Sequence, residues 1–149
     1  MDRADFTLVH SLRVRWGEVD KQGVVFNPHY FSYFDVAVTE YWRAIDYPYP
    51  EAMTGAGTDV FAIQATAAFH ASAAYDDVLD VGCRVARLGR SSMQWVFGIW
   101  RRAEHLTSGE VVYVHAHLAT RKAVPLPDPL REAILRFERK PPGSESGRT

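Results

Sequence analysis

The chain has 149 residues, of which 47% are hydrophobic and 23% are charged, and its formal net charge is −1. This size and composition fit one ordinary globular domain and exclude a disordered or fibrous chain. Basic and acidic side chains are nearly balanced and form no polybasic run, which excludes a general electrostatic attraction to nucleic acid. We therefore expect a single domain over residues 1–140 and no nucleic acid among its partners.

Cysteine content and the start of the chain predict where the protein resides. Cys83 is the single cysteine and lies in an alternating apolar stretch, where it reads as a small buried side chain, not as half of a disulfide. The first ten residues include two acids and no continuous apolar core, and no apolar run elsewhere is long enough to cross a bilayer. We expect a cytoplasmic protein without membrane insertion.

The first predicted element is a strand over residues 6–16, where apolar and polar residues alternate with the period of a half-buried strand. A turn-like stretch follows. The next predicted element is a helix, because Asn27 is a favoured N-cap and Pro28 suits the first helical position. Apolar residues recur at helical spacing from Tyr30 to Ile45, over so wide a stripe that this helix needs to be wrapped by other elements.

Four further strands are predicted from period-two patterns centred on residues 61–69, 81–85, 93–99 and 112–118. Residues 89–91 and 107–109 are interpreted as hairpin connections, so consecutive strands should be antiparallel. A short helix over residues 129–137 closes the domain. The remaining residues, 141–149, are rich in Pro, Gly and Ser and are predicted to be a disordered tail.

One strand, one helix and four strands predict an α+β domain in which a five-stranded antiparallel sheet curls around a long central helix. A single sheet of this kind leaves an edge strand open. An open edge favours a homodimer in which the sheet continues from one subunit into the next.

Residues 14–31, VRWGEVDKQGVVFNPHYF, closely resemble the signature of the 4-hydroxybenzoyl-CoA thioesterase-like family. The shared elements are Asp20, the apolar run that follows Gly23, and a short cap that opens the central helix. The similarity continues through the helix, residues 89–92 and the closing VPLP of residues 124–127. The resemblance implies the hotdog fold, hydrolysis of acyl-CoA thioesters, a homodimer or homotetramer with active sites at the subunit interface, and no metal or redox cofactor. Coenzyme A would enter only as part of the substrate.

Thioester hydrolysis needs a nucleophile or an activated water at the carbonyl carbon, and donors aimed at the oxygen where negative charge develops. Asp20 is the candidate for the first role, either as general base or as direct nucleophile, and the sequence leaves both open. The second role falls to unpaired backbone N–H groups at the helix start, around Asn27, Pro28 and His29, at the positive end of the helix dipole. The side chains of Asn27 and His29 are further candidates to orient substrate or water.

Candidate substrate contacts lie in the signature and at the first hairpin turn, where a guanidinium and hydroxyl groups suit the phosphates of coenzyme A. The candidate catalytic and substrate-binding residues each have an ordinary structural interpretation as well, such as a turn acid for Asp20 or core packing for Tyr30. No metal site is expected, since His115 and His117 share a strand face without a third ligand. The candidate substrate contacts are Gly23, Val24, Tyr30, Arg90, Ser91 and Ser92.

Two other functions stay open. A hotdog dehydratase or hydratase acting on an acyl thioester would need a further catalytic histidine beside the acid, and the sequence offers no such motif. A non-catalytic, dimeric acyl-CoA-binding domain would keep the apolar helix and the sheet but would tolerate the loss of Asp20.

Overall fold

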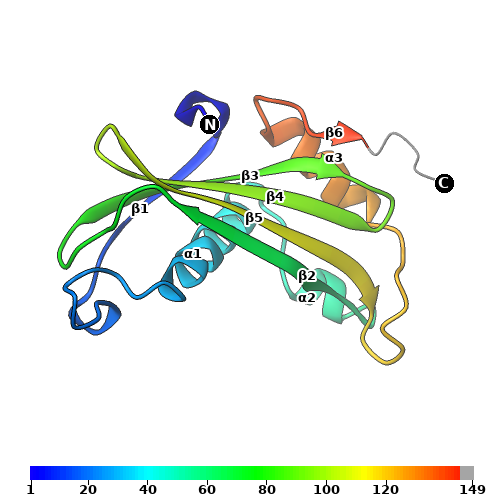
Figure 1. Cartoon of the computed structure of the whole chain (residues 1–149). Coiled ribbons are helices and arrows are strands. Elements are labelled where there is room, and N and C mark those ends of the chain that lie inside the picture. Colours follow the sequence, from blue (N-terminus) through cyan, green and yellow to red (C-terminus); the bar gives the residue numbers. More distant parts are fainter. Residues whose placement is uncertain (145–149) are drawn as a thin grey trace.

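The computed structural model describes residues 1–144, and a five-stranded antiparallel sheet wrapped around one long helix forms its body (Figure 1). The strand order is β1-β3-β4-β5-β2, so β1 and β2 are the outer strands of this path. The predicted α+β architecture is confirmed. The long elements are β1 (Leu8–Arg13), α1 (His29–Ala44), β2 (Thr58–Phe69), β3 (Val78–Leu88), β4 (Ser92–Arg101) and β5 (Glu104–His117).

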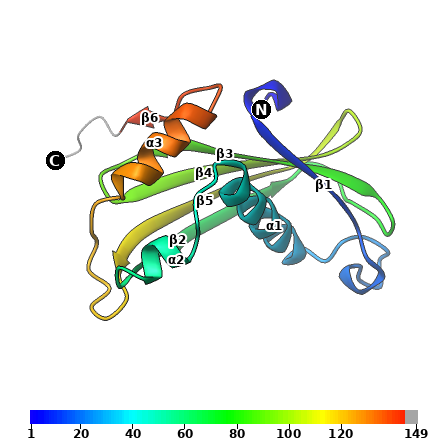
Figure 2. The same ribbon diagram turned by 180° about the vertical axis from the view of Figure 1, so that it is seen from behind.

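Helix α1 is buried against the sheet through apolar residues spaced three and four apart, among them Tyr30, Phe34, Ala37 and Tyr41. The Phe34 ring stacks on that of Phe97 in β4, with a centroid distance of 4.5 Å and an interplanar angle of 17°. The predicted central helix is thus confirmed, and its wide apolar stripe is explained by the sheet that wraps it. Seen from behind, α1 lies in front of the strands (Figure 2).

The predicted hairpin at residues 107–109 is wrong, because these residues lie inside β5. The turn between β4 and β5 lies earlier, where Arg101 pairs with Glu104 and Arg102 adopts a φ of 54°. Gly109 is required for a different reason: a Cβ atom there would lie 2.3 Å from Cζ of Phe34. Gly109 is therefore a glycine that permits close helix packing and not a turn glycine.

The other predicted hairpin is confirmed. The N–H of Gly89 donates to the carbonyl of Ser92 at 2.8 Å, which closes the turn between β3 and β4. The predicted first strand is shorter than expected, since β1 ends at Arg13 and Trp16 begins a single 3-10 turn, η2 (Trp16–Glu18), with its side chain exposed.

Smaller elements complete the described chain. Helix α3 (Asp128–Phe137) confirms the predicted closing helix and lies on the same side of the sheet as α1 (Figure 2), where Phe137 contacts the ring of Tyr41. Two short helical segments, η1 (Arg3–Asp5) and α2 (Glu51–Thr54), were not predicted. Within the predicted tail, β6 (Gly143–Ser144) pairs in parallel with the end of β3, and residues 145–149 lie outside the described part. No helix in residues 1–144 has both the length and the apolar character needed to cross a membrane.

Candidate active site

The segment between η2 and α1 folds into a small hairpin that carries Asp20. Val19 pairs with Val25, the N–H of Asp20 donates to the carbonyl of Val24 at 2.9 Å, and the N–H of Gly23 donates back to the carbonyl of Asp20 at 2.9 Å. Gly23 has a φ of 80°, a conformation that glycine adopts without steric cost. Glycine therefore allows the tight turn that brings the chain back beside Asp20.

This hairpin is docked on the segment that precedes β3. Val24 bridges to Ala74, and the N–H of Val25 donates to the carbonyl of Ala73 at 2.9 Å. The hydroxyl of Tyr30 in α1 accepts the N–H of Ala73 at 3.1 Å. The segment that precedes β3 is thus bonded both to the hairpin, through backbone groups, and to the first turn of α1, through the Tyr30 hydroxyl.

Asp20 is half-buried, and its Oδ1 accepts the N–H of Gln22 at 2.8 Å. This bond is the local turn contact that aspartate makes in loops. The other carboxylate oxygen has no hydrogen-bond partner within residues 1–144. The turn contact orients the carboxylate and leaves one oxygen for water or a thioester carbon.

The start of α1 leaves one backbone N–H unpaired, not several. The N–H of His29 donates to the carbonyl of Phe26 at 2.9 Å, and Pro28 has no N–H, so the expectation of free donors at these two positions is wrong. Short i→i+3 bonds tighten this helix entrance and consume its donors. The N–H of Asn27 finds no acceptor within the described chain, and it is the group that remains for an oxyanion.

The side chain of Asn27 does not cap α1. The N-cap position is Pro28, without a side-chain hydrogen bond, and the helix begins at His29. The prediction of an Asn27 N-cap is therefore wrong, because the tight turn from Phe26 already takes the N–H that such a cap would bind. Asn27 is exposed, which leaves its amide free to contact a substrate.

Among the other predicted residues of the signature, Tyr30 is 2% exposed and packs its ring 5.0 Å from that of Phe69. Tyr30 therefore contributes to the core and fixes the first turn of α1. His29 is half-buried, with its ring edge-on to the exposed ring of Phe26 at 6.0 Å. Gly23 is exposed at the hairpin tip, while Val24 is half-buried beside Ala74.

Sequence reasoning missed Glu18, a carboxylate that is 8% exposed and lies two residues before Asp20. Its Oε1 accepts the backbone N–H of Arg15 at 2.8 Å and the hydroxyl of Tyr33 at 3.0 Å. Its Oε2 accepts the guanidinium of Arg15 at 2.9 Å. Burial raises the pKa of Glu18, but these donors outweigh it and the net pKa is lowered. No local pattern identifies this site, because Tyr33 is fifteen residues away in the sequence.

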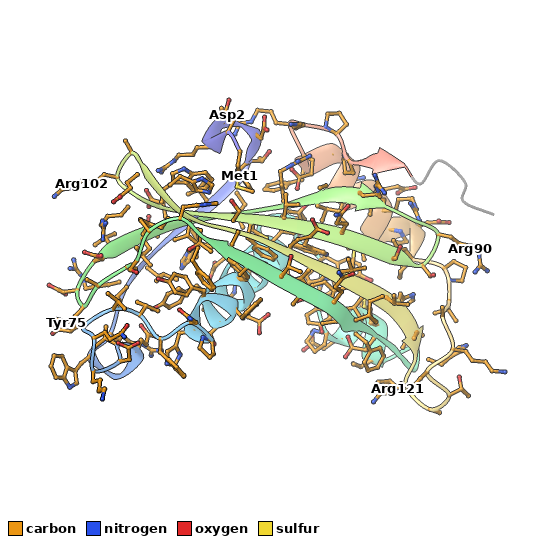
Figure 3. All side chains as sticks on the ribbon, in the orientation of Figure 1. Met1, Asp2, Tyr75, Arg90, Arg102 and Arg121 are labelled. Carbon is orange, nitrogen blue, oxygen red and sulfur yellow. The ribbon has the colours of Figure 1, made fainter. Side chains whose placement is uncertain are left out.

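Arg90, Ser91 and Ser92 lie at the far end of the sheet from the Asp20 hairpin. Figure 3 shows Tyr75, which neighbours the hairpin, and Arg90 at opposite ends. The eleven residues of β3 separate the two ends, roughly 35 Å at the usual rise per residue. Arg90 is exposed, and the carbonyl of Ser91 accepts the N–H of His115 at 2.8 Å. A single chain therefore does not bring this turn to Asp20.

A cleft of about 870 Å³ lies farther along α1. Asp35 and Trp42 of α1, Tyr49 of the following loop and Tyr113 of β5 line it. The rings of Trp42 and Tyr49 stack at 4.8 Å, and burial raises the pKa of Tyr49 to about 12. Partial burial also raises the pKa of Asp35. The cleft combines aromatic walls with two carboxyl groups, those of Asp35 and Asp46, and such apolar walls with a few polar groups are the composition of a small-molecule site.

His115 has a structural role. Its Nδ1 lies 2.8 Å from the carbonyl of Pro125 and its Nε2 lies 2.7 Å from Oγ1 of Thr58. Within residues 1–144, no three His, Cys, Asp or Glu side chains are grouped so that they could hold a metal ion.

A long helix wrapped by a curved five-stranded antiparallel sheet is the hotdog fold. The chain belongs to the thioesterase superfamily, whose family model matches residues 22–108, more than half of its length. The match begins two residues after Asp20 and includes the start of α1. The predicted family and the hotdog fold are confirmed.

Individual relatives are distant. A protein of Aquifex aeolicus (strain VF5) is 26% identical over 126 residues, which are 85% of this chain and 96% of that protein. The structure of a 1,4-dihydroxy-2-naphthoyl-CoA thioesterase from Synechocystis is 20% identical, with a TM-score of 0.79, and the match covers 85% of this chain and 93% of that protein. The structure of a DHNA-CoA thioesterase from Staphylococcus aureus is 22% identical, with a TM-score of 0.78, and the match covers 84% of this chain and 86% of that protein. At these identities the structural likeness establishes the fold alone.

Proposed function

We propose that this protein hydrolyses an acyl-CoA thioester to a free acid and coenzyme A, with Asp20 as the catalytic carboxylate and the N–H of Asn27 as the oxyanion donor. One observation carries the proposal. Among residues 1–144, the hairpin holds a carboxylate oxygen without a hydrogen-bond partner and, at its exit into α1, an N–H without an acceptor. Membership of the thioesterase superfamily and a fold shared with acyl-CoA thioesterases support this choice of chemistry.

Two routes use these groups. As general base, Asp20 takes a proton from water, the water oxygen attacks the carbonyl carbon, and the N–H of Asn27 stabilises the oxyanion until the thiolate of coenzyme A leaves and is protonated by Asp20. As nucleophile, a carboxylate oxygen of Asp20 attacks directly, coenzyme A leaves, and water hydrolyses the resulting anhydride. Neither route needs a metal or a redox cofactor.

The acyl group of the substrate is proposed to lie along α1 toward the cleft lined by Asp35 and Trp42. Asp35 lies eight residues beyond Asn27, about 12 Å along a helix of this pitch. An acyl group of this length, with an aromatic or branched end, would reach the aromatic walls. Hydrophobic burial in such a cleft would supply binding energy without touching the reacting atoms.

Coenzyme A is proposed to contact a second subunit. β2 is an outer strand of the sheet, and Ile63 on it is 65% exposed. If two copies pair their β2 strands antiparallel about a two-fold axis, each end of one subunit's sheet lies beside the opposite end of the partner's sheet. Arg90, Ser91 and Ser92 of the partner subunit would then lie at the end that carries Asp20, within reach of the phosphates. Assembly as a dimer or tetramer, and a cytoplasmic location, stay predictions from the sequence.

The test is thiol release from a panel of short, long, branched and aromatic acyl-CoAs, with wild type and Asp20→Asn side by side. We expect Asp20→Asn to lower kcat on every accepted substrate by about a hundredfold or more, since general acid–base groups commonly supply that much. Folding and affinity for coenzyme A should be nearly unchanged, because the two side chains are matched in size.

Asp76→Asn is the matched control. Asp76 is an exposed acid on the neighbouring segment and pairs with Arg13 at the surface, so its loss should leave turnover unchanged. Wild-type turnover in Asp20→Asn would remove Asp20 from the mechanism. Binding of coenzyme A without hydrolysis of any panel member would favour a non-catalytic acyl-CoA-binding domain.

A further inference from the structure

We infer that Glu18 is a positioning residue for the proposed reaction: its buried carboxylate holds the hairpin that carries Asp20, and that leads into Asn27, against helix α1. This inference rests on the proposed function. Glu18 itself forms no hydrogen bond with either reacting group, since its hydrogen bonds within the described chain are with Arg15, Tyr33 and Phe26.

Glu18 joins the hairpin at both of its ends. Through its side chain it binds Tyr33, which is 3% exposed and lies in the second turn of α1. Through its backbone carbonyl it accepts the N–H of Phe26, the residue before Asn27, at 2.9 Å. Asp20 lies on one arm of the hairpin that begins at Glu18, and Asn27 lies just beyond the other arm. A movement of Glu18 relative to α1 would therefore change the separation of the two proposed catalytic groups.

The two oxygens of Glu18 differ in what they hold. Oε2 faces the guanidinium of Arg15, whose side chain is 82% exposed, so that water can replace this contact. Oε1 accepts the buried hydroxyl of Tyr33 and the N–H of Arg15. Burial, followed by the bond to Glu18, raises the pKa of Tyr33, which keeps its hydroxyl protonated as a donor. The Oε1 contacts are the ones that fix the hairpin.

The difference between the two oxygens gives a sharp test. Glu18→Ala and Tyr33→Phe should each lower kcat by roughly tenfold to a hundredfold with KM nearly unchanged, because a misplacement of about 1 Å at a reacting group can cost this much. Glu18→Gln should recover most of kcat, since its amide oxygen can replace Oε1. The double variant Glu18→Ala with Tyr33→Phe should be no slower than the slower single variant, because both substitutions remove the same hydrogen bond, the one between Glu18 and Tyr33.

Arg13→Ala is the control, because it removes an exposed ion pair on β1 without touching this contact. All rates are measured well below each variant's unfolding midpoint, with far-UV circular dichroism at the assay temperature. Loss of kcat in folded protein at constant KM, reversed by Glu18→Gln, separates positioning from general destabilisation.

Asp20→Asn is measured beside these variants. Full turnover in Tyr33→Phe, an isosteric change that should fold, would overturn the inference while an inactive Asp20→Asn leaves the proposed function standing. A Glu18→Gln variant as slow as Glu18→Ala would also overturn it, because charge and not the Oε1 contact would then matter. Full turnover in Asp20→Asn would overturn the proposed function and the positioning role together.

Discussion

Asn27 offers a substrate two different groups, its side-chain amide and its backbone N–H. The amide is exposed and does not cap α1, whereas the N–H is left over after the tight turn at the helix start has used the donor of His29. A backbone donor is fixed by the hairpin and loses no side-chain freedom when the oxyanion forms. This rigidity is what a preorganised oxyanion site requires.

Replacement of Asn27 by alanine separates the two groups, because alanine keeps the N–H and removes the amide. We expect kcat of Asn27→Ala to stay within about threefold of wild type, whereas removal of an oxyanion donor costs on the order of a hundredfold or more. Steady-state kinetics on the best panel substrate measure this. A loss as large as that of Asp20→Asn would move the catalytic role from the backbone to the side chain.

At the scale of elements, α3 is attached to α1 and to β3 by one buried carboxylate. Glu138, at the C-terminal end of α3, is 6% exposed. Its Oε1 accepts the hydroxyl of Tyr41 at 2.8 Å and the N–H of Val85 at 3.0 Å. Val85 lies where the register between β3 and β4 shifts, and Glu138 satisfies its N–H there. The hydrogen bonds of Glu138 thus connect α3 to α1 and to the β-bulge of β3.

Glu138 makes stability depend on pH. Burial raises its pKa above the ordinary 4.5, although Tyr41, Val85 and Arg84 act in the opposite direction. A carboxyl with a raised folded-state pKa contributes its full stability below the unfolded pKa and loses it as the pH rises through the folded pKa. Relative to Glu138→Gln, wild type should therefore lose free energy of unfolding as the pH is raised from about 4 to about 8.

Urea unfolding of wild type and Glu138→Gln at several pH values measures this difference. Glu132→Gln, an exposed acid on the same helix, serves as the control and should follow wild type at every pH. Parallel stability curves for wild type and Glu138→Gln would show that Glu138 titrates alike in the folded and unfolded protein.

At the scale of the whole molecule, β2 is the long strand whose outer edge pairs with no other strand of residues 1–144. Ile63 and Phe69 on it are exposed, and the strand has twelve residues, longer than an edge that a monomer would leave unprotected. No charged residue lies between Asp59 and the end of the strand. These features suit pairing with a second copy, which is also what would bring Arg90 to the Asp20 end.

Ile63→Lys tests this assembly, since a charge on an exposed strand edge opposes strand pairing. We expect a monomer in sedimentation velocity, with thioester hydrolysis lost alongside the dimer. Leu135→Lys is the matched control, because Leu135 is an equally apolar residue, 50% exposed, on α3 and away from this edge. A wild-type monomer, or a fully active Ile63→Lys monomer, would contradict a site shared between subunits.

Features with a local signal could be predicted from the sequence. The helical spacing of Tyr30, Phe34 and Tyr41, the alternation in the strands, and the Gly89 turn each depend on neighbours within a few residues. The signature around Asp20 indicated the family in the same way, because its spacing lies within one stretch of chain. The chain alone thus determined the α+β class, the order of elements, and Asp20 as a candidate catalytic acid.

Tertiary structure decided the features that depend on contacts between distant residues. Gly109 permits the approach of Phe34 and is not a turn, Glu18 meets Tyr33 from fifteen residues away, and the donor of His29 is used while that of Asn27 is not. The separation of Arg90 from Asp20 likewise follows from the length of β3. Each of these outcomes is set by which groups the fold brings within bonding distance, and sequence spacing carries no information about contacts that close only when the sheet wraps the helix.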